Sequence, residues 1–570
     1  MLLVTRRPGW TYAAVIASSS VLSSLYWLWF VRAEKTLYSW DHVAYWSMTA
    51  GLAERLFQQP FQSLLAVARS VAESELNLLP ALPLAPVLAV FGDSRLSWIL
   101  AVSNLYALPS LALGGWAVHR IVRATRRDPS GPSTATLVAA WVGAVLWLMP
   151  FWEPVALGYL GVGGVALAFV VYGLVFGPDA CTRREADLQS LVIGLTLALL
   201  VLFRRWYAFW SLAFCLVLAL DAIQAAWTEA RKGGTKSVRH TLRRPVLVAA
   251  GLVTTLLALA APRMVTIATT DYGDRFVHYD SLTTFSAEML NVVSRFGVVA
   301  LFLVAAGVVL GWQRAGMRRP VLLIVLHTVI TALMFRQVQD PSPQHWYLVL
   351  PGLLVVLAIG LSHEALRGRL RTVIVGMAAF SAAGVLGLGP GLPAPLGSAV
   401  KIAPAVRSDL GEIEKLLELL DGRVQLGAQW IYVLSGTGVL SGSGLGFAEW
   451  SLGAAHPACS RILQTNQVDL RDGFPDGLFA ADVVLLPVPI QVRGDGRTQR
   501  VITVPAEDFL EDQGIARAFA RLPLTFELDG GVQVRVFERV RPSTPEEIRA
   551  VSDRLRGYYP NRAEVFTPAR

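Results

Sequence analysis

The sequence predicts a mostly α-helical polytopic membrane protein followed by a C-terminal α/β or α+β domain in water. Three observations predict this fold. Of the 570 residues, 54% are hydrophobic and only 16% are charged, whereas about a quarter of the residues in soluble domains carry charge. Long apolar runs recur through the first two thirds of the chain. After the Pro/Gly-rich stretch "GLGPGLPAPLG" the composition becomes that of a soluble domain, so we divide the chain into 1–390 and 391–570.

The apolar runs predict about eleven transmembrane helices, because a spanning helix needs about 20 apolar residues. The predicted spans are 10–31, 97–118, 135–150, 155–177, 188–203, 206–227, 245–268, 296–312, 320–335, 347–362 and 372–389. The stretch 83–91 is too short to cross and is expected to be re-entrant or interfacial. The first run has the basic flank of a secretory signal but no cleavage site of small residues, so we expect an uncleaved helix.

The distribution of Lys and Arg predicts the orientation. With the N-terminus in the cytoplasm, the segments between spans hold 20 Lys and Arg on the inner side and 10 on the outer side, as the positive-inside rule requires. The same rule accounts for the net charge of +9. The sequence shows no basic patch interleaved with aromatic residues, so it gives no indication of nucleic-acid binding. We therefore expect a multi-pass protein of the bacterial inner (plasma) membrane, with the long loop 32–96 and the C-terminal domain on the periplasmic or extracellular side.

The C-terminal region has the patterns of a small mixed domain. Residues 407–421 have the periodicity of an amphipathic helix. The stretches "WIYVL" and "ADVVLLPVPI" have the apolar pattern of buried strands, and "TFELDGGVQVRVFERV" has the pattern of a hairpin. The Gly-rich stretch 434–447 has no Gly-Lys-Ser/Thr and no acid at the dinucleotide-fingerprint position, so we expect a flexible loop. The three cysteines, Cys181, Cys215 and Cys459, lie too far apart in sequence to indicate a metal site or a disulfide framework.

The first outer loop contains one carboxylate among aromatic residues, in "KTLYSWDHVAYWSMTAGLAE" (35–54). Helical spacing places Asp41, Tyr45 and Met48 on one face. Asp is a preferred N-cap residue, so Asp41 has two interpretations, a helix cap or a chemical group, and one residue can serve both.

Four stretches resemble the polytopic, lipid-carrier-dependent glycosyltransferases of the GT-C type, in the branch of the protein O-mannosyltransferases and aminoarabinose transferases. They are "WDHVAYW" just after the first span, "NLLPALPLAPVLAVFGDSRLSWILAVSNLYAL" (77–108), "LVIGLTLALLVLFRRWYAFWSL" (191–212) and "QHWYLVLPGLLVV" (344–356). The resemblance covers about residues 10–390, and an outer soluble domain after the last span also fits it.

The resemblance implies transfer of a sugar from a polyprenyl-phosphate carrier to an acceptor lipid, glycan or protein of the cell envelope on the outer face, with inversion. Asp41 matches the family's first-loop acid and would be the base that takes the acceptor's proton. Relatives carry Asp-Glu where this chain has Asp41-His42, which weakens any metal site there. We assign no cofactor, and a divalent cation stays an open alternative. His42 either hydrogen-bonds the substrate or is a surface histidine.

Further polar residues lie on the predicted outer side. Arg204 and Arg205 contradict the positive-inside trend, so they bind either the departing phosphate or lipid headgroups. Arg336 is a second phosphate candidate. Glu153 is the only charged residue in its turn. It is either an acid that the turn brings to the site or a solvated turn residue.

Aromatic residues and one more loop complete the predicted site. His345, Trp346 and Tyr347 line the sugar pocket or belong to an interfacial aromatic belt. The loop 269–285 is expected to cover the carrier or acceptor.

Two other functions remain as alternatives. A transporter or flippase for lipid-linked saccharide would place ionisable residues at the centres of its helices, and the acids here gather at one face instead. An assembly or polymerase subunit of envelope synthesis would use the soluble domain for docking.

Overall fold

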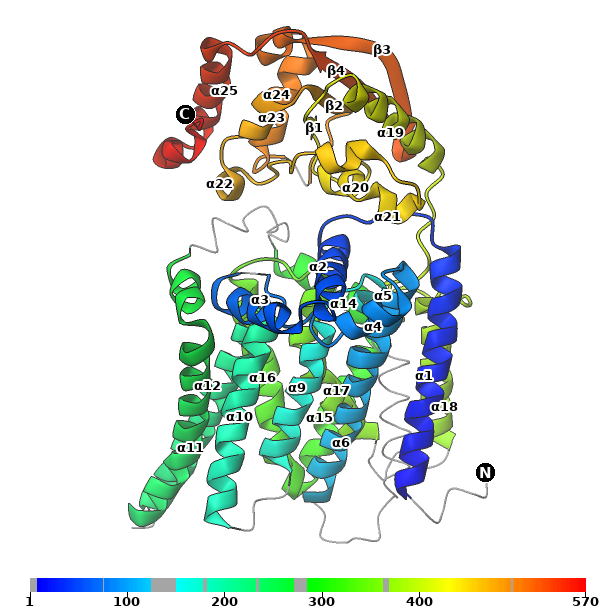
Figure 1. Cartoon of the computed structure of the whole chain (residues 1–570). Helices are drawn as coiled ribbons and strands as arrows, with labels where there is room; N and C mark the ends of the chain where they lie inside the picture. Colours follow the sequence, from blue (N-terminus) through cyan, green and yellow to red (C-terminus); the bar gives the residue numbers. More distant parts are fainter. Residues whose placement is uncertain are drawn as a thin grey trace.

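The computed structural model describes residues 8–74, 76–124, 150–177, 182–231, 235–270, 284–361, 369–493 and 496–569. Within these ranges the chain forms a bundle of long helices with a smaller mixed domain at one end (Figure 1). Three short helices of the first loop lie at this end of the bundle, beneath the mixed domain. We call it the soluble-domain end.

The bundle is built from helices that follow the predicted apolar runs. They are α1 (Pro8–Ala33), α5 (Arg95–Val102), α6 (Leu108–Ala124), α9 (Val162–Phe176), α10 (Arg183–Phe203), α11 (Tyr207–Arg231), α12 (Thr235–Thr269), α14 (Phe285–Phe296), α15 (Val298–Gln313), α16 (Arg318–Arg336), α17 (Leu350–Leu361) and α18 (Arg369–Val385). A π-helical turn, η1 (Ser103–Ala107), joins α5 to α6, and shorter turns are α8 (Glu153–Ala156), η3 (Ala315–Met317) and η4 (Pro343–Leu348).

Among the described residues, six helices are long and apolar enough to cross a membrane, or seven if the bent pair α14–α15 is one span. These seven lie at seven of the eleven predicted spans. The predicted spans 155–177, 347–362 and 372–389 correspond to the shorter helices α9, α17 and α18, of 15, 12 and 17 residues. The span 135–150 lies outside the described residues but for its last residue. The prediction of about eleven full spans is therefore confirmed only in part.

The short helices have a physical reason. At about 1.5 Å per residue, α9 and α17 fall short of the roughly 30 Å hydrocarbon core. Almost every residue of α17 is buried, so protein rather than lipid surrounds this helix, and its last residue, Leu361, is also the last one described before 369. The start of α9 is delayed by Gly158, whose φ of +71° and contact with the Trp98 ring leave no room for a side chain.

A sharp bend of 94° separates α14 from α15. Gly297 lies at the bend with φ +78°, and a Cβ there would come within 2.5 Å of the backbone of Gly397. The N–H of Val298 donates to the carbonyl of Pro395 (3.0 Å). The Pro/Gly-rich stretch after α18 thus packs into the bend, and only glycine fits between the two segments.

The first loop forms α2 (Asp41–Leu56), α3 (Pro60–Glu73) and α4 (Ala85–Phe91). The stretch predicted to be re-entrant or interfacial becomes the short helix α4 at the soluble-domain end of the bundle (Figure 1). The Trp46 indole donates to the carbonyl of Asp93 (2.8 Å). A buried Arg95–Glu34 ion pair (3.2 Å) joins the start of α5 to the end of α1, which fixes the loop on the bundle.

The soluble domain has a four-stranded sheet in the order β1-β2-β4-β3. β1 is parallel to β2, and the other neighbours are antiparallel. Its elements are α19 (Leu410–Gln425), β1 (Ile431–Val433), α20 (Gly442–Gly446), α21 (Ala448–Leu452), η6 (Pro457–Arg461), α22 (Asp469–Asp472), α23 (Asp476–Ala480), β2 (Val483–Val488), α24 (Arg500–Leu510), η7 (Gly514–Ala518), β3 (Phe519–Leu528), η8 (Asp529–Gly531), β4 (Val532–Arg539), α25 (Pro545–Tyr558) and η9 (Pro560–Phe566).

Both faces of this sheet are covered by helices. Leu416 and Leu420 of α19 pack with Val433 of β1 in one buried cluster. Phe509 of α24 and Leu555 of α25 pack with the opposite face in another. The predicted helix, two buried strands and hairpin are all present. The stretch 434–447, predicted to be a flexible loop, runs without a helix to Ser441, which then caps the first turn of the short helix α20.

Candidate active site

An ion pair links the first loop to the bundle at the soluble-domain end. Asp41 is the first residue of α2, and its Oδ2 lies 3.3 Å from a guanidinium nitrogen of Arg204. Arg204 occupies the turn between α10 and α11. No side-chain cap hydrogen bond is made at the start of α2, where Trp40 is the N-cap residue. The N-cap interpretation of Asp41 therefore fails, although its charge still favours the helix N-terminus.

Arg204 also covers an aromatic cavity. Its guanidinium carbon lies 4.9 Å from the centre of the Tyr45 ring. Both residues line a small cavity of about 10 Å³, together with Tyr159, Gly161, Trp206, Tyr207, Gln344, Tyr347 and Leu348. Its lining combines apolar rings with a few polar groups, as small-molecule sites do, but a volume this small holds about one water molecule at most.

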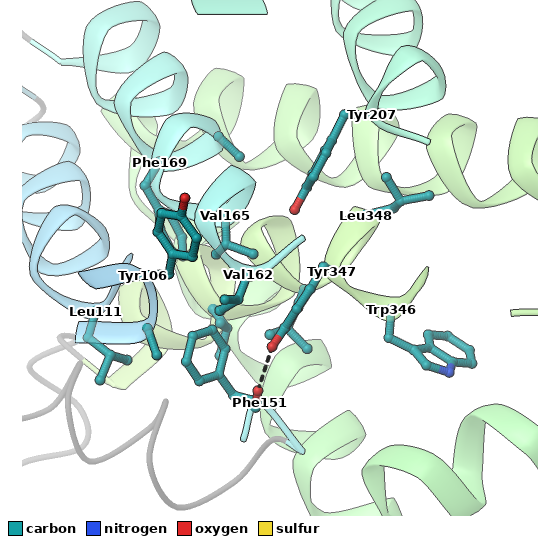
Figure 2. Packing of buried hydrophobic residues seen from close by; sticks show 14 of the residues in the cluster. Tyr106, Leu111, Phe151, Val162, Val165, Phe169, Tyr207, Trp346, Tyr347 and Leu348 are labelled. Carbon is teal, nitrogen blue, oxygen red and sulfur yellow. Dashed lines mark hydrogen bonds between the residues drawn. The ribbon is translucent and has the colours of Figure 1, made fainter. Parts of the chain in front are cut away.

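Two tyrosines of the cavity wall are held by backbone carbonyls. Tyr347 donates to the carbonyl of Phe151 (3.0 Å; Figure 2), and Tyr207 donates to that of Gly161 (2.8 Å). Trp346 points away from these two rings (Figure 2) and packs edge-on against Phe296. The structure thus brings Tyr347 to the cavity, whereas Trp346 is a packing residue.

Two polar atoms of the cavity wall are buried without a protein partner in the described structure, the Tyr45 hydroxyl and Gln344 Oε1. A buried polar atom without a hydrogen bond costs about 1–3 kcal/mol. Most such atoms in folded proteins find a partner. A water molecule, or a ligand hydroxyl in a widened cavity, would supply such a partner.

The turn that carries Arg204 is strongly basic. Burial lowers the pKa of Arg204, Asp41 opposes this, and the positive charges of Arg205 and Arg263 lower it further. Arg205 itself stacks over the Trp206 ring, 4.6 Å from its centre. Arg263 lies on α12 and is only 3% exposed. Two further cations therefore lie close enough to Arg204 to add to the positive field around the cavity.

His42 and Glu153 flank the cavity without lining it. The His42 ring meets the Tyr159 ring edge-on, with centroids 5.6 Å apart. Burial, with the nearby Arg95, lowers the pKa of His42 to about 4, so the imidazole is neutral near pH 7. Glu153 forms an ion pair with Arg295. Burial raises the pKa of Glu153 and Arg295 opposes that rise, so Glu153 is not a simple solvated turn residue.

Arg336 and His345 lie apart from the cavity lining. Arg336 is held by Glu288 (2.5 Å) and Asp340 (3.4 Å), so two carboxylates already balance its charge. Nδ1 of His345 accepts from the N–H of Ser342 (3.0 Å) and closes the start of η4. Burial, with Arg204 and Arg205, lowers the pKa of His345 well below its usual range. Both residues thus have structural partners that explain them.

Six residues of the cavity lining were not predicted from the sequence, namely Tyr159, Gly161, Trp206, Tyr207, Gln344 and Leu348. Arg263, whose charge acts on Arg204, was not predicted either. Arg263 could have been singled out from the sequence, because a charged residue inside an apolar run indicates a functional position. Tyr207 and Gln344 stand within motifs that were singled out for their neighbours. Tyr159 has no local signal, because α8 and Gly158 place it.

No metal site emerges from the described ranges, in which no three His, Cys, Asp or Glu side chains gather closely enough to hold an ion. The predicted loop 269–285 with its acids and His278 falls almost entirely outside those ranges.

Comparison with known proteins gives one structural likeness. No protein-family model matches the chain, and no curated protein matches it. A solved structure, ArnT from Cupriavidus metallidurans bound to undecaprenyl phosphate, is similar, with 14% identity and a TM-score of 0.41 over 80% of this chain and 75% of that one. The chain is thus similar to a protein crystallised with a polyprenyl phosphate, at a level from which neither substrate nor mechanism follows.

Proposed function

We propose that this protein is a glycosyltransferase that moves a sugar from a polyprenyl-phosphate carrier to a hydroxyl of an envelope lipid, glycan or protein, at the outer face of the membrane. The observation that carries the proposal is the Asp41–Arg204 pair beside a cavity lined with tyrosines. One carboxylate, one cation and an aromatic wall with unpartnered polar atoms are the groups that such a transfer needs.

The reaction assigns a role to each group. The acceptor hydroxyl gives its proton to Asp41 and its oxygen attacks the anomeric carbon. The bond from that carbon to the phosphate oxygen breaks, and the electron pair leaves with the polyprenyl phosphate. Attack from the face opposite the phosphate inverts the anomeric configuration. Arg204 stabilises the charge that develops on the phosphate.

The contact between Asp41 and Arg204 suggests how the base is prepared. It is single-pronged at 3.3 Å, longer than a good charge-assisted hydrogen bond. A donor phosphate offers Arg204 a bidentate partner, which its planar fork prefers. Binding of the donor would then draw the guanidinium from Asp41 and leave the carboxylate to accept the proton. Arg205 and Arg263 would strengthen the attraction for the phosphate.

The position of the charges favours an enzyme over a transporter. The Asp41–Arg204 pair and Arg205 lie at one end of the bundle, at a turn between helices. A transporter would hold its ionisable groups near the midplane.

The test compares the wild type with Asp41→Asn in nanodiscs, with release of polyprenyl phosphate from a panel of polyprenyl-phosphate sugars as the readout and envelope extract as the source of acceptors. Asn keeps the size of the side chain and removes the base. We expect wild-type turnover with at least one donor and loss of nearly all of it in the folded variant. Retention of most activity in the variant would remove Asp41 from the mechanism. Absence of turnover in the wild type would turn attention to transport, measured as flux of the same lipids.

A further inference from the structure

The segment that leads into Asp41 is bound to the soluble domain along its whole length. The N–H of Lys35 donates to the carbonyl of Ala405 (2.8 Å), and the N–H of Arg407 donates to that of Lys35 (2.8 Å). Three residues later, the N–H of Tyr38 donates to Ser451 Oγ (3.1 Å). The backbone of the first loop therefore pairs with the soluble domain before it reaches α2.

Trp40 is attached through both its backbone and its ring. Its N–H donates to Ser443 Oγ (3.3 Å), and the guanidinium of Arg493 lies 4.4 Å from its ring centre. Gly438 is also close, since a Cβ built on it would lie 3.9 Å from Cη2 and Cζ3 of the Trp40 ring. The groups around Trp40 thus come from two separate loops of the soluble domain, one of them the Gly-rich stretch 434–447.

The backbone of Trp40 shows why this clamp matters. Its φ of 51° and ψ of −131° lie in a region that residues with a bulky side chain rarely occupy. Such a conformation persists only where surrounding contacts hold it. The N–H of Ala44 donates to the carbonyl of Trp40 (2.9 Å), so the orientation of this peptide sets the direction in which α2 begins.

Asp41 therefore lies between two anchors. Its carboxylate is held by Arg204 of the bundle, and its backbone is held through Trp40 by the soluble domain. A second aromatic contact, between Trp46 of α2 and Trp450 with centroids 4.4 Å apart, continues the same attachment along α2.

We propose that the soluble domain is a positioning device for the active site: Arg493 and Ser443 hold Trp40 in its strained conformation and thereby place the Asp41 carboxylate against Arg204. They are positioning residues, since neither lines the cavity. The proposal rests on the proposed function of Asp41 as the base. It assigns to the Gly-rich stretch a mechanical role in place of a ligand-binding one.

The first test removes the cation over Trp40. Arg493→Ala is expected to lower kcat by about tenfold or more, because small displacements of a catalytic group are costly, while KM for the donor stays close to that of the wild type. Arg493→Lys should restore most of the loss, since a lysine can keep a cation over the ring. The matched control is Arg500→Ala, which removes a cation–π contact of the same 4.4 Å to Tyr558 within the soluble domain.

The second test links the segment before α2 to the soluble domain with a disulfide. A Cβ built on Gly444 lies 3.8 Å from Cβ of Ser39, the mean separation in disulfides. In Ser39→Cys/Gly444→Cys, oxidation should form the bond in high yield, and wild-type kcat should persist. Combined with Arg493→Ala, oxidation should return most of the lost kcat, and reduction should remove it again. Loss of activity on locking the otherwise normal protein would instead identify a lid that must open, and would overturn the proposal.

A measurement that does not use turnover separates this proposal from the proposed function. Hydrogen exchange of the backbone amides in 38–48 should quicken in Arg493→Ala and stay unchanged in Arg500→Ala. If no donor is turned over even by the wild type, the proposed function fails, and the exchange data still decide whether the soluble domain holds this segment. Equal exchange and equal kcat in the two variants would overturn the positioning role.

Discussion

Replacing Arg204 with methionine tests the site at its centre, because the expected effects on stability and on catalysis differ widely. The Arg204 side chain is 15% exposed and that of Asp41 33%, so their pairing is partly screened by water. A single-pronged pair of this kind contributes about 1 kcal/mol at most. The cation–π contact with Tyr45 adds about 1 kcal/mol. Methionine keeps most of the apolar stem, so we expect the free energy of unfolding to fall by roughly 2 kcal/mol or less.

The expected effect on catalysis is larger. Removing one group that stabilises developing negative charge costs about 10²- to 10³-fold in rate, and Arg204→Met should lower kcat/KM by that amount. Arg204→Lys should recover only part of it, because an ammonium group cannot bind two phosphate oxygens as a fork.

Turnover in nanodiscs and thermal unfolding of the same preparations would measure both quantities. The control is Arg319→Met, which breaks the ion pair between Arg319 and Asp221 (2.5 Å). Arg319 lies in the first turn of α16 and does not line the cavity. If kcat/KM of Arg204→Met equals that of this control, Arg204 does not act on the phosphate and the mechanism proposed here is wrong.

Two further predictions concern the cavity wall and pH. Tyr45→Phe should leave the thermal midpoint unchanged or slightly raised, because the lost hydroxyl has no protein partner in the described structure. The same variant should raise KM for the donor by about tenfold if that hydroxyl bonds the sugar. A lowered midpoint with a normal KM would show that the hydroxyl stabilises the fold instead. The pKa of His42 is about 4 in the folded protein, below its ordinary value of 6.5. Between these two pH values the unfolded chain binds more protons than the folded protein does. The free energy of unfolding therefore falls as the pH is lowered from 6.5 to 4. His42→Gln should therefore narrow the difference between thermal midpoints measured near pH 7 and near pH 5, and an unchanged difference would contradict the burial of His42.

Asp41 could be singled out from the sequence because its context was unusual, a lone carboxylate in an aromatic stretch beside a membrane span. Its partner also left a signal, since Arg204 stands on the side of the membrane where the charge bias predicts few cations. The contact between them spans 163 residues and depends on how α2 lies against the turn of α10 and α11, which no local pattern encodes.

Hydropathy located the helices well and their lengths poorly. The predicted span 155–177 begins as a continuous helix only at Val162, because Gly158 has a φ of +71°, which a right-handed helix excludes. Of the two interpretations of Asp41, the N-cap failed, because Trp40 takes the N-cap position and no side-chain hydrogen bond is made there. Trp40 itself is held by Ser443, 403 positions away, and no window of sequence contains such a contact.

The attachment of Trp40 to Ser443 joins residues 403 positions apart, and this separation has a consequence for how the molecule is made. During synthesis the first loop leaves the ribosome long before the loops that clamp it exist, since domains form from the N-terminus onward. The whole helical bundle is synthesised in the interval. A nascent chain interrupted after α18 therefore contains every bundle helix and both members of the Asp41–Arg204 pair, but not the contacts that fix Trp40. The final geometry of the site is among the last features that the growing chain acquires.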